Sequence, residues 1–264
     1  MTKLKILILF TLIGISFFVF NQAKAAIAFD AMATSTVAGS ITSTTFAHTV
    51  GTGANRALFV GVGYADSTQG ITGVTYAGVA LTQGAYSNAF TYGRSYIYYM
   101  VAPASGTNNV VVTYAGTLSA DDRGGVGAVS YTGVAQTSPI DVTGTTSTDP
   151  GTSMTIALTT TSANDWIFNN FWWGGSGTNT VKYSETKRWQ FPATGTNNGS
   201  ADKATTAVGA YNTGWDGTVS NSGVMSAVAF KESVAGKRRI FISLENTLLK
   251  SVASLIKNTL WENI

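Results

Sequence analysis

The chain has 264 residues, of which 11% are charged, and it carries a formal net charge of +3, no cysteine and one histidine. The lack of cysteine excludes disulfides, a lipid-modified cysteine and cysteine-ligated zinc, and one histidine leaves too few ligands for another zinc site. Residues 26–235 hold eight Lys and Arg against eleven Asp and Glu. A body without a basic surplus offers no electrostatic footprint for nucleic acid, and its length suits one sizeable hydrophobic core.

The first 25 residues have the pattern of a cleavable secretory signal peptide. Lys3 and Lys5 precede an apolar run over residues 6–20, and residues 23–25 read Ala-Lys-Ala, the small-residue pattern that signal peptidase accepts. The apolar run is shorter than the roughly 20 residues that a membrane-spanning helix needs, which counts against an uncleaved anchor. We therefore predict cleavage before Ala26 and an extracellular or cell-surface protein.

Residues 26–235 predict a domain built of β-strands alone. Runs rich in Val, Ile, Thr, Tyr and Phe alternate with Gly, Asn, Thr and Ser, and no helical period interrupts them. Residues 94–101 are apolar or aromatic on both faces and predict a central strand, whereas residues 42–50 alternate as a half-exposed strand does. The predicted strands cover residues 28–36, 41–50, 57–64, 71–76, 79–83, 94–102, 108–115, 125–132, 153–160, 165–173, 179–184, 203–211 and 223–231.

A five-residue pattern recurs in the first half of this domain. Residues 74–78 and 112–116 read Val-Thr-Tyr-Ala-Gly, and residues 129–133 read Val-Ser-Tyr-Thr-Gly. Val and Tyr two positions apart point to one face of a strand, and Gly permits the turn that follows. The unequal spacing argues against a solenoid or propeller. Many short strands with regular turns predict one two-sheet antiparallel β-sandwich, jelly-roll-like, over residues 26–235.

The pattern changes in residues 236–264. Residues 237–239 form a basic linker, and the residues after them repeat apolar side chains at helical spacing, with basic side chains opposite. The apolar stripe contains Leu244, Leu248, Val252 and Leu255. We expect a C-terminal amphipathic helix outside the sandwich. It can dock on the domain, contact another protein chain, lie on a membrane surface, or be disordered when isolated.

Patterns that carry catalysis are absent or weak. His48 lies on an apolar face of a predicted strand with no nucleophile signature beside it, which favours a structural histidine over a catalytic base. Acidic residues are scattered, and the adjacent Asp121 and Asp122 fit a solvated turn better than a calcium site. The glycine clusters 51–53 and 61–63 open no helix and so offer no phosphate site. We predict no catalytic residue, no metal and no cofactor.

Tryptophans are the candidates for a ligand site. Trp172 and Trp173 are neighbours in a predicted strand and therefore point to opposite faces, which places one in the core and the other at the surface. Trp189 and Trp215 lie in turn-rich stretches beside Asn, Asp and Lys. Exposed aromatic rings with polar neighbours suit sugars, which stack on aromatic planes and hydrogen-bond at their edges. We assign these four as ligand-binding residues, which requires at least two on one exposed face; the alternative is that they close the core.

Six stretches in order along the chain carry a family resemblance: residues 48–56, 60–62, 73–78, 98–107, 127–137 and 225–230. With such segments as Gly-Val-Thr-Tyr-Ala-Gly at 73–78, the chain over residues 28–231 resembles a family of secreted bacterial β-sandwich modules common in surface proteins of uncultured lineages. The stretches mark strands and turns. The resemblance therefore implies the fold and transfers no catalytic or binding residue, and the tail after residue 231 has no counterpart.

These patterns together predict a secreted or cell-surface, non-catalytic binding or adhesion module, with carbohydrate as the candidate ligand. A structural envelope or surface-layer protein without a soluble ligand is the alternative. A third reading, a glycoside-active enzyme on a sandwich scaffold, requires two carboxylates that converge on a cleft. Expected partners are a glycan or cell-envelope polymer, and a membrane surface or protein at the C-terminal helix, but no nucleic acid.

Overall fold

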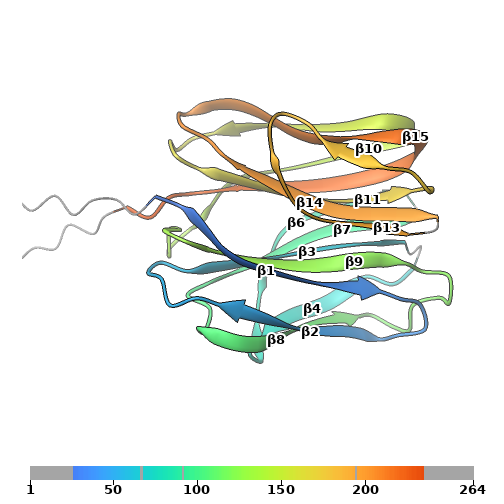
Figure 1. Ribbon diagram of the computed structural model, residues 1–264, viewed down its shortest axis with the longest axis horizontal. Coiled ribbons are helices and arrows are strands. Elements are labelled where there is room, and N and C mark those ends of the chain that lie inside the picture. The colour runs from blue at the N-terminus through green and yellow to red at the C-terminus, as the bar shows by residue number, and fades with distance from the viewer. Residues whose placement is uncertain (1–25, 66–67, 91, 194, 235–264) are drawn as a thin grey trace, which may run out of the picture. The chain divides into compact units, whose positions relative to one another are not determined.

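The computed structural model describes residues 26–65, 68–90, 92–193 and 195–234, which belong to one compact unit, Lys24–Val234 (Figure 1). The predicted signal peptide (1–25) and the predicted linker and helix (236–264) lie outside the described residues. Within these residues the fold is all-β and the strand pairings are antiparallel, which confirms that part of the prediction. No helix of the described ranges is long and apolar enough to cross a membrane.

As far as β9 the strands of the described ranges lie close to the predicted positions, except for β6 (Thr82–Phe90), of which the predicted strand 79–83 covers only the first two residues. β7 is hydrogen-bonded to β3 on one side and to β6 on the other, so the central strand predicted near residues 94–101 is confirmed. The strands are β1 (Ala28–Val37), β2 (Ser43–Val50), β3 (Ala57–Ala65), β4 (Ile71–Tyr76), β5 (Val79–Ala80), β6 (Thr82–Phe90), β7 (Gly93–Val101), β8 (Gly106–Tyr114), β9 (Gly124–Thr132), β10 (Ile140–Thr160), β11 (Trp166–Gly174), β12 (Asn179–Val181), β13 (Thr186–Ala193), β14 (Thr196–Ala204) and β15 (Gly209–Phe230).

These strands form three sheets where the sequence predicts two. A four-stranded sheet has the order β2-β8-β4-β5, and a five-stranded sheet has the order β1-β9-β3-β7-β6. The third sheet has the order β10-β15-β11-β14-β13, with β12 paired to β15. Figure 1 shows the sheets as layers, with β2, β4 and β8 at the bottom and β10 and β15 at the top. The two-sheet prediction is therefore wrong, because a third sheet covers the second face of the five-stranded sheet.

An apolar first core lies between the four-stranded and the five-stranded sheet. Every second residue of β3 from Leu58 to Tyr64 belongs to it, together with Val and Tyr residues of β4 and β8. The recurring pattern behaves as predicted. Val74 and Tyr76 are 1% and 0% exposed, and Gly78 follows them with a φ of +78° in the turn to β5.

Glycine lines the other face of the five-stranded sheet. A Cβ atom added at Gly93 would overlap the indole ring of Trp172, and one at Gly127 would lie 2.6 Å from that of Trp189. Glycine therefore lets wide side chains of the third sheet reach the strand backbone. The glycines that meet third-sheet side chains in this way are Gly61, Gly63, Gly93, Gly125 and Gly127. A second core of rings and aliphatic side chains fills the rest of this interface.

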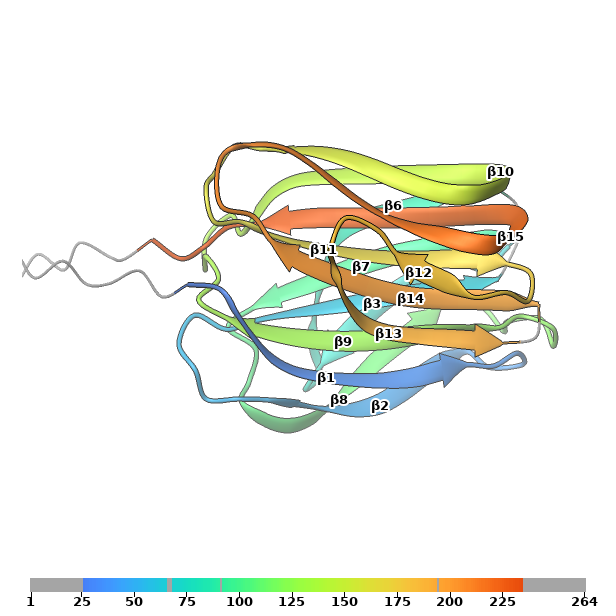
Figure 2. The same ribbon diagram turned by 45° about the horizontal axis from the view of Figure 1, so that its top comes forward.

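β10 and β15 are long enough to cover the outer face of their own sheet. Residues 223–230 of β15 pair with β11, whereas residues 209–216 pair with the second half of β10. Apolar side chains of this outer hairpin pack on the outward side chains of β11 and form a third core. Figure 2 shows β10 and β15 together above β11 and β14. The third sheet is therefore buried on both faces.

The sequence misplaces the strands of the third sheet. The strand predicted over residues 203–211 is wrong, because β14 ends at Ala204 and β15 begins at Gly209. β14 reads Thr-Asn-Asn-Gly-Ser-Ala-Asp-Lys-Ala, a composition typical of turns. It is nonetheless a buried strand because its polar side chains find partners: Asn198 Nδ2, for example, donates to Phe171 O at 2.6 Å.

Candidate functional site

The four predicted ligand-binding tryptophans are buried. Trp172, Trp173, Trp189 and Trp215 are 3%, 1%, 6% and 0% exposed. This corrects the expectation that at least two of them share an exposed face. A sugar ring cannot stack on an indole that the protein already covers on both sides, so these residues belong to the cores.

The covering of both faces of the third sheet explains their burial. Trp172 and Trp173 point in opposite directions, as predicted. Trp172 faces Gly93 of the five-stranded sheet, and Trp173 lies in the third core with Trp215. Trp189 also faces the five-stranded sheet, and its Nε1 donates to Asn198 Oδ1 at 3.3 Å. The turn-rich neighbourhoods of Trp189 and Trp215 are strands in the structure.

His48 lies in a buried polar chain rather than in a catalytic triad. Its Nε2 is 3.2 Å from Ser130 Oγ, and that hydroxyl donates to Asp30 Oδ2 at 2.7 Å. In a triad the carboxylate holds the histidine, whereas here it holds the serine, and His48 Nδ1 has no hydrogen-bond partner among the described residues. Burial lowers the pKa of His48 to about 4, and the attraction of Asp30 opposes this shift. A neutral ring at pH 7 and a serine that is 0% exposed fit a structural role.

Two carboxyl groups meet at the start of the third sheet. Burial, and next the hydrogen bond to Asp141, raise the pKa of Asp165 to about 8. Asp141 also accepts from the backbone N of Thr161 at 2.6 Å. Carboxyl groups in hydrogen-bond contact are closer than the roughly 5 Å or more that glycosidases place between their two carboxylates. Asp165 is 0% exposed, so its carboxyl group is not open to a cleft.

The acidic pair considered for calcium lies in the turn before β9. The backbone N of Ser119 donates to Asp122 Oδ2 at 2.6 Å, and the backbone N of Asp122 donates to Ser119 O at 3.0 Å. Asp122 thus closes the turn, and Asp121 is exposed beside it. Among the described residues, no group of three or more His, Cys, Asp and Glu is arranged to hold a metal ion.

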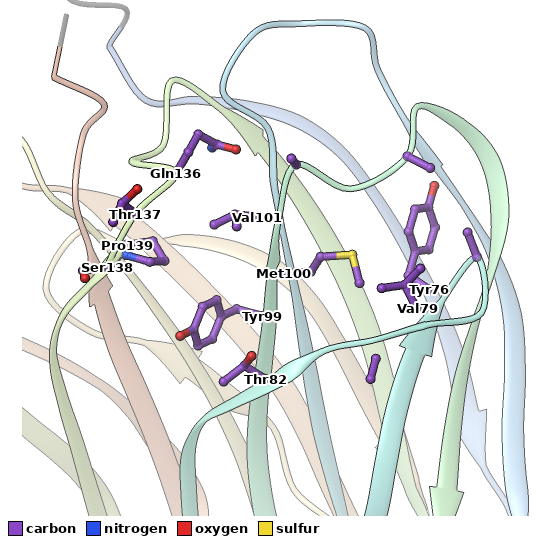
Figure 3. A pocket seen from close by; sticks show the side chains of 14 residues that line it. Tyr76, Val79, Thr82, Tyr99, Met100, Val101, Gln136, Thr137, Ser138 and Pro139 are labelled. Atoms are coloured by element: carbon purple, nitrogen blue, oxygen red, sulfur yellow. The ribbon is translucent and has the colours of Figure 1, made fainter. Parts of the chain in front are cut away.

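An open groove with a volume of about 730 Å³ lies at one end of the sandwich. The turn between β4 and β5, the end of β7 and the connection from β9 to β10 surround it. Figure 3 shows Tyr99, Met100 and Val101 in its middle, with Tyr76 and Val79 on one side and Gln136 to Pro139 on the other. Its lining residues are Tyr76, Ala77, Val79, Ala80, Thr82, Tyr99, Met100, Val101, Ala102, Ala104, Gln136, Thr137, Ser138 and Pro139.

Two side chains of the groove, Tyr99 and Gln136, are fixed by contacts with residues beneath the groove surface. The Tyr99 ring is partly exposed and stacks on Phe59 of the second core, with 6.2 Å between centroids and 27° between planes. Gln136 Nε2 donates to Val134 O at 2.8 Å and to Arg56 O at 3.1 Å. Both amide hydrogens of Gln136 are thereby used, so its carbonyl oxygen is the group left to accept from a ligand. An aromatic ring and a fixed acceptor thus share one open site.

The backbone around the groove is strained. Eight non-glycine residues of the described chain have positive φ, and three of them line the groove: Ala77 (51°), Ala102 (48°) and Ser138 (46°). Residues with a Cβ rarely adopt this region, and such strain persists where the surroundings enforce it, often at binding sites. The backbone N of Ala102 is held by Arg56 O at 2.9 Å.

No pattern in the sequence marks the residues that line the groove as a binding site. Residues 73–78, 98–107 and 127–137, which carry part of the family resemblance, supply most of its lining. They read as strands and turns, and the groove depends on three turns that lie far apart in the chain and close together in space. Runs such as Ala-Pro-Ala-Ser-Gly contain no aromatic or charged residue that would mark a site.

No protein-family model matches the chain, and no curated protein matches it. The resemblance to secreted surface modules therefore remains an interpretation of the sequence, and the site rests on its own geometry.

Proposed function

We propose that this chain is an exported, non-catalytic surface module that binds a ligand in the end groove. The observation that carries the proposal is the groove itself. Its volume lies within the roughly 300–1,000 Å³ of ligand sites, and its lining is mostly apolar with a few fixed polar groups, as such sites are. Its residues come from turns at the end of a sandwich, where a rigid scaffold presents binding loops.

Carbohydrate is the ligand class that fits this lining best. The Tyr99 ring offers an aromatic surface backed by Phe59, and sugars stack on such surfaces. The Gln136 carbonyl and the exposed hydroxyl groups of Thr82, Thr137 and Ser138 supply acceptors and donors at the rim. The lining holds no charged side chain, which favours a neutral glycan over an ionic ligand.

The strand order supports a jelly-roll-like scaffold for this site. β1, β3, β7 and β9 belong to one sheet, and β2, β4, β5 and β8 belong to the other. With β6 also in the first of these sheets, the chain crosses repeatedly between two facing sheets, as in a double-sheet jelly roll. We interpret the third sheet as an addition to this sandwich, which leaves the turns at its end free to form the groove.

The ligand class is tested with a glycan array and a polysaccharide pull-down on residues 26–234. We expect binding to neutral glycans. Ala104→Trp, which places a ring in the groove, should abolish this binding, whereas Ala163→Trp, at an exposed alanine outside the groove, should leave it as in the parent. Tyr99→Ala should weaken binding by roughly 1–3 kcal/mol. No binding to any glycan would favour the alternative, a structural envelope protein, and glycan binding that survives Ala104→Trp would refute the site.

Export and surface retention are separate parts of the proposal. The leader pattern predicts that the exported product begins at Ala26, which N-terminal sequencing of the secreted protein checks; an unprocessed N-terminus would contradict it.

The basic, amphipathic tail is proposed to retain the protein on the envelope. Removing residues 236–264 should therefore release more of the domain into the medium, and an unchanged distribution between cells and medium would exclude this role.

A further inference from the structure

A lysine, a glutamate and an asparagine lie together beneath the outer hairpin of β10 and β15, away from the groove. Asn169 of β11 is 0% exposed, and Glu185 is 7% exposed just before β13. Lys203 of β14 has a side chain that is 15% exposed, and its Nζ lies 3.9 Å from Glu185 Oε1. The cluster thus combines an amine, a carboxyl group and a carboxamide in a largely dry site.

The Asn169 carboxamide is held by four hydrogen bonds. Its Oδ1 accepts from Trp215 Nε1 at 2.9 Å and from the backbone N of Ala201 at 3.1 Å. Its Nδ2 donates to Glu185 Oε2 at 3.2 Å and to Thr213 Oγ1 at 2.6 Å. Two fixed donors on a carbonyl oxygen are the arrangement that stabilises an oxyanion when a nucleophile adds to the carbon. The carboxyl group on Nδ2 is placed to protonate a leaving nitrogen.

The amine and the carboxyl group are both shifted toward their neutral forms. Burial raises the pKa of Glu185, and hydrogen bonds from Thr213, Gly214 and Asn169 oppose the shift. Burial lowers the pKa of Lys203, against the attraction of Glu185. A neutral lysine amine is a nucleophile, and a neighbouring carboxyl group can take up and deliver its proton.

The strand register brings the amine within reach of the amide. Ile167 pairs with Lys203 and Asn169 pairs with Ala201, so Lys203 is the diagonal neighbour of Asn169 on the same face. Diagonal neighbours are roughly 7–8 Å apart, a distance that long side chains span. Lys203 Nζ now donates to Asn212 O, and the reaction requires this bond to be exchanged for contact with Asn169.

We propose that Lys203 and Asn169 join in an intramolecular amide cross-link between β14 and β11. Lys203 Nζ attacks Asn169 Cγ as a neutral amine and passes one proton to the Glu185 carboxylate, which gives a tetrahedral intermediate. Trp215 Nε1 and the Ala201 N–H hold the oxyanion of this intermediate. Glu185 then protonates Nδ2, the Cγ–Nδ2 bond breaks, and ammonia leaves. One C–N bond forms and one breaks, so no oxidant or further reactant is required.

A covalent brace at this position suits the composition of the chain. The sequence has no cysteine, so an exported domain of this kind cannot be stabilised by disulfides. The cross-link would join strands that are already neighbours in the third sheet and fix the polar strand β14 in place. This inference is independent of the groove and of any ligand.

Intact-mass spectrometry of the purified full chain tests the cross-link. We expect the folded protein to be lighter than its sequence mass by one molecule of ammonia, and a digest to yield a branched peptide that joins residues 169 and 203. Lys203→Arg, which keeps the charge, and Glu185→Gln, which removes the proton carrier, should both restore the full mass. Lys182→Arg is the matched control, because Lys182 contacts the same Tyr183 ring as Lys203 and should leave the loss unchanged.

Two results would overturn the proposal. One is a folded parent protein that keeps its full sequence mass after prolonged incubation near neutral pH. The other is a loss of ammonia that persists in Lys203→Arg, which would assign it to succinimide formation at Asn198 and Gly199 instead. If Glu185→Gln fails to fold, the masses of the parent and of Lys203→Arg are sufficient to decide whether the cross-link forms.

Discussion

The two faces of the five-stranded sheet are covered by neighbours of opposite character. Toward the four-stranded sheet, alternate residues of β3 from Leu58 to Tyr64 meet other apolar side chains. Toward the third sheet, the same strand presents Gly61 and Gly63 to buried amides of Asn170 and Asn198. An apolar interface accepts many side chains of suitable volume. A glycine-lined interface with buried polar groups accepts only the partners that fill and satisfy it.

Hydrogen bonds between the sheets make the second interface specific. Ser95 Oγ donates to Asn170 O at 2.8 Å, and Ser226 Oγ donates to Ser95 O at 2.9 Å. All three residues are 0% exposed. A buried donor or acceptor left without its partner costs about 1–3 kcal/mol. The first interface is therefore expected to tolerate conservative exchange, and the second is expected to resist it.

The largest expected effect is that of removing a tryptophan from the second interface. Trp189→Ala should lower the free energy of unfolding by about 3–5 kcal/mol, because it leaves a cavity over Gly127 and removes the hydrogen bond to Asn198 Oδ1. Leu58→Met in the first core is the comparison and should cost less than about 1.5 kcal/mol. Urea unfolding of both variants measures the difference. Equal, small losses in the two would show that the interfaces do not differ.

Lowering the pH should reduce the free energy of unfolding, because His48 in the four-stranded sheet is buried in its neutral form. Its pKa is lowered from 6.5 to about 4 in the fold, so the unfolded chain takes up a proton at a higher pH than the folded chain does. Stability therefore falls as pH drops from 6.5 to 4, by about 3 kcal/mol relative to a variant that does not titrate. His48→Gln supplies that variant. Parallel stability curves for the two proteins over this range would contradict the assignment.

Replacing glycine by alanine should reduce stability where another sheet packs against the glycine, and should have little effect where the added methyl group meets open space. Gly93→Ala should destabilise by about 1–3 kcal/mol, since the new Cβ overlaps Trp172. Gly73→Ala is the matched control, because no atom lies within 4 Å of its added Cβ, and it should change stability by less than about 0.5 kcal/mol. Thermal unfolding of the pair is sufficient, and equal melting temperatures would show that the close approach of the sheets is not required.

Raising the pH should reduce the free energy of unfolding, because Asp165 at the start of the third sheet is buried in its protonated form. Its pKa is raised from 3.8 to about 8, so the folded chain keeps a proton that the unfolded chain loses. The stability that this proton supplies is complete below pH 4 and is lost as pH rises toward 8. Asp165→Asn, which can still donate to Asp141, should be more stable than the parent at pH 8 by about 1–2 kcal/mol. A less stable variant at pH 8 would mean that the carboxylate is needed.

The residues themselves explain which parts of this fold the sequence reveals. β2 to β4 and β7 to β9 can be predicted because their side chains alternate between apolar and polar or are apolar throughout, as in residues 94–101. β14 cannot, because Asn197, Asn198, Ser200 and Asp202 have turn-like or charged character. Their burial depends on partners such as Trp189 Nε1 and Arg188, which only the folded sheet brings near.

The site was harder to foresee than the fold. Tryptophan is a reasonable marker of a sugar site in a two-sheet sandwich, where one face of each sheet meets solvent. A third sheet removes that solvent, and all four candidates become core. The glycines at 61, 63, 93, 125 and 127 carry the missing signal, since glycine repeated on one face of a strand indicates close approach of another element. The groove has no such signal, because its lining joins three distant turns.

The most direct test of binding in the end groove is a backbone NMR titration of residues 26–234 with the glycan that binds best in the array. We predict that the amide signals of residues 76–80, 99–102, 104 and 136–138 shift together and saturate with one affinity, and that Ala104→Trp abolishes these shifts while Ala163→Trp preserves them. Saturable shifts confined to another surface, with these three segments unchanged, would contradict it.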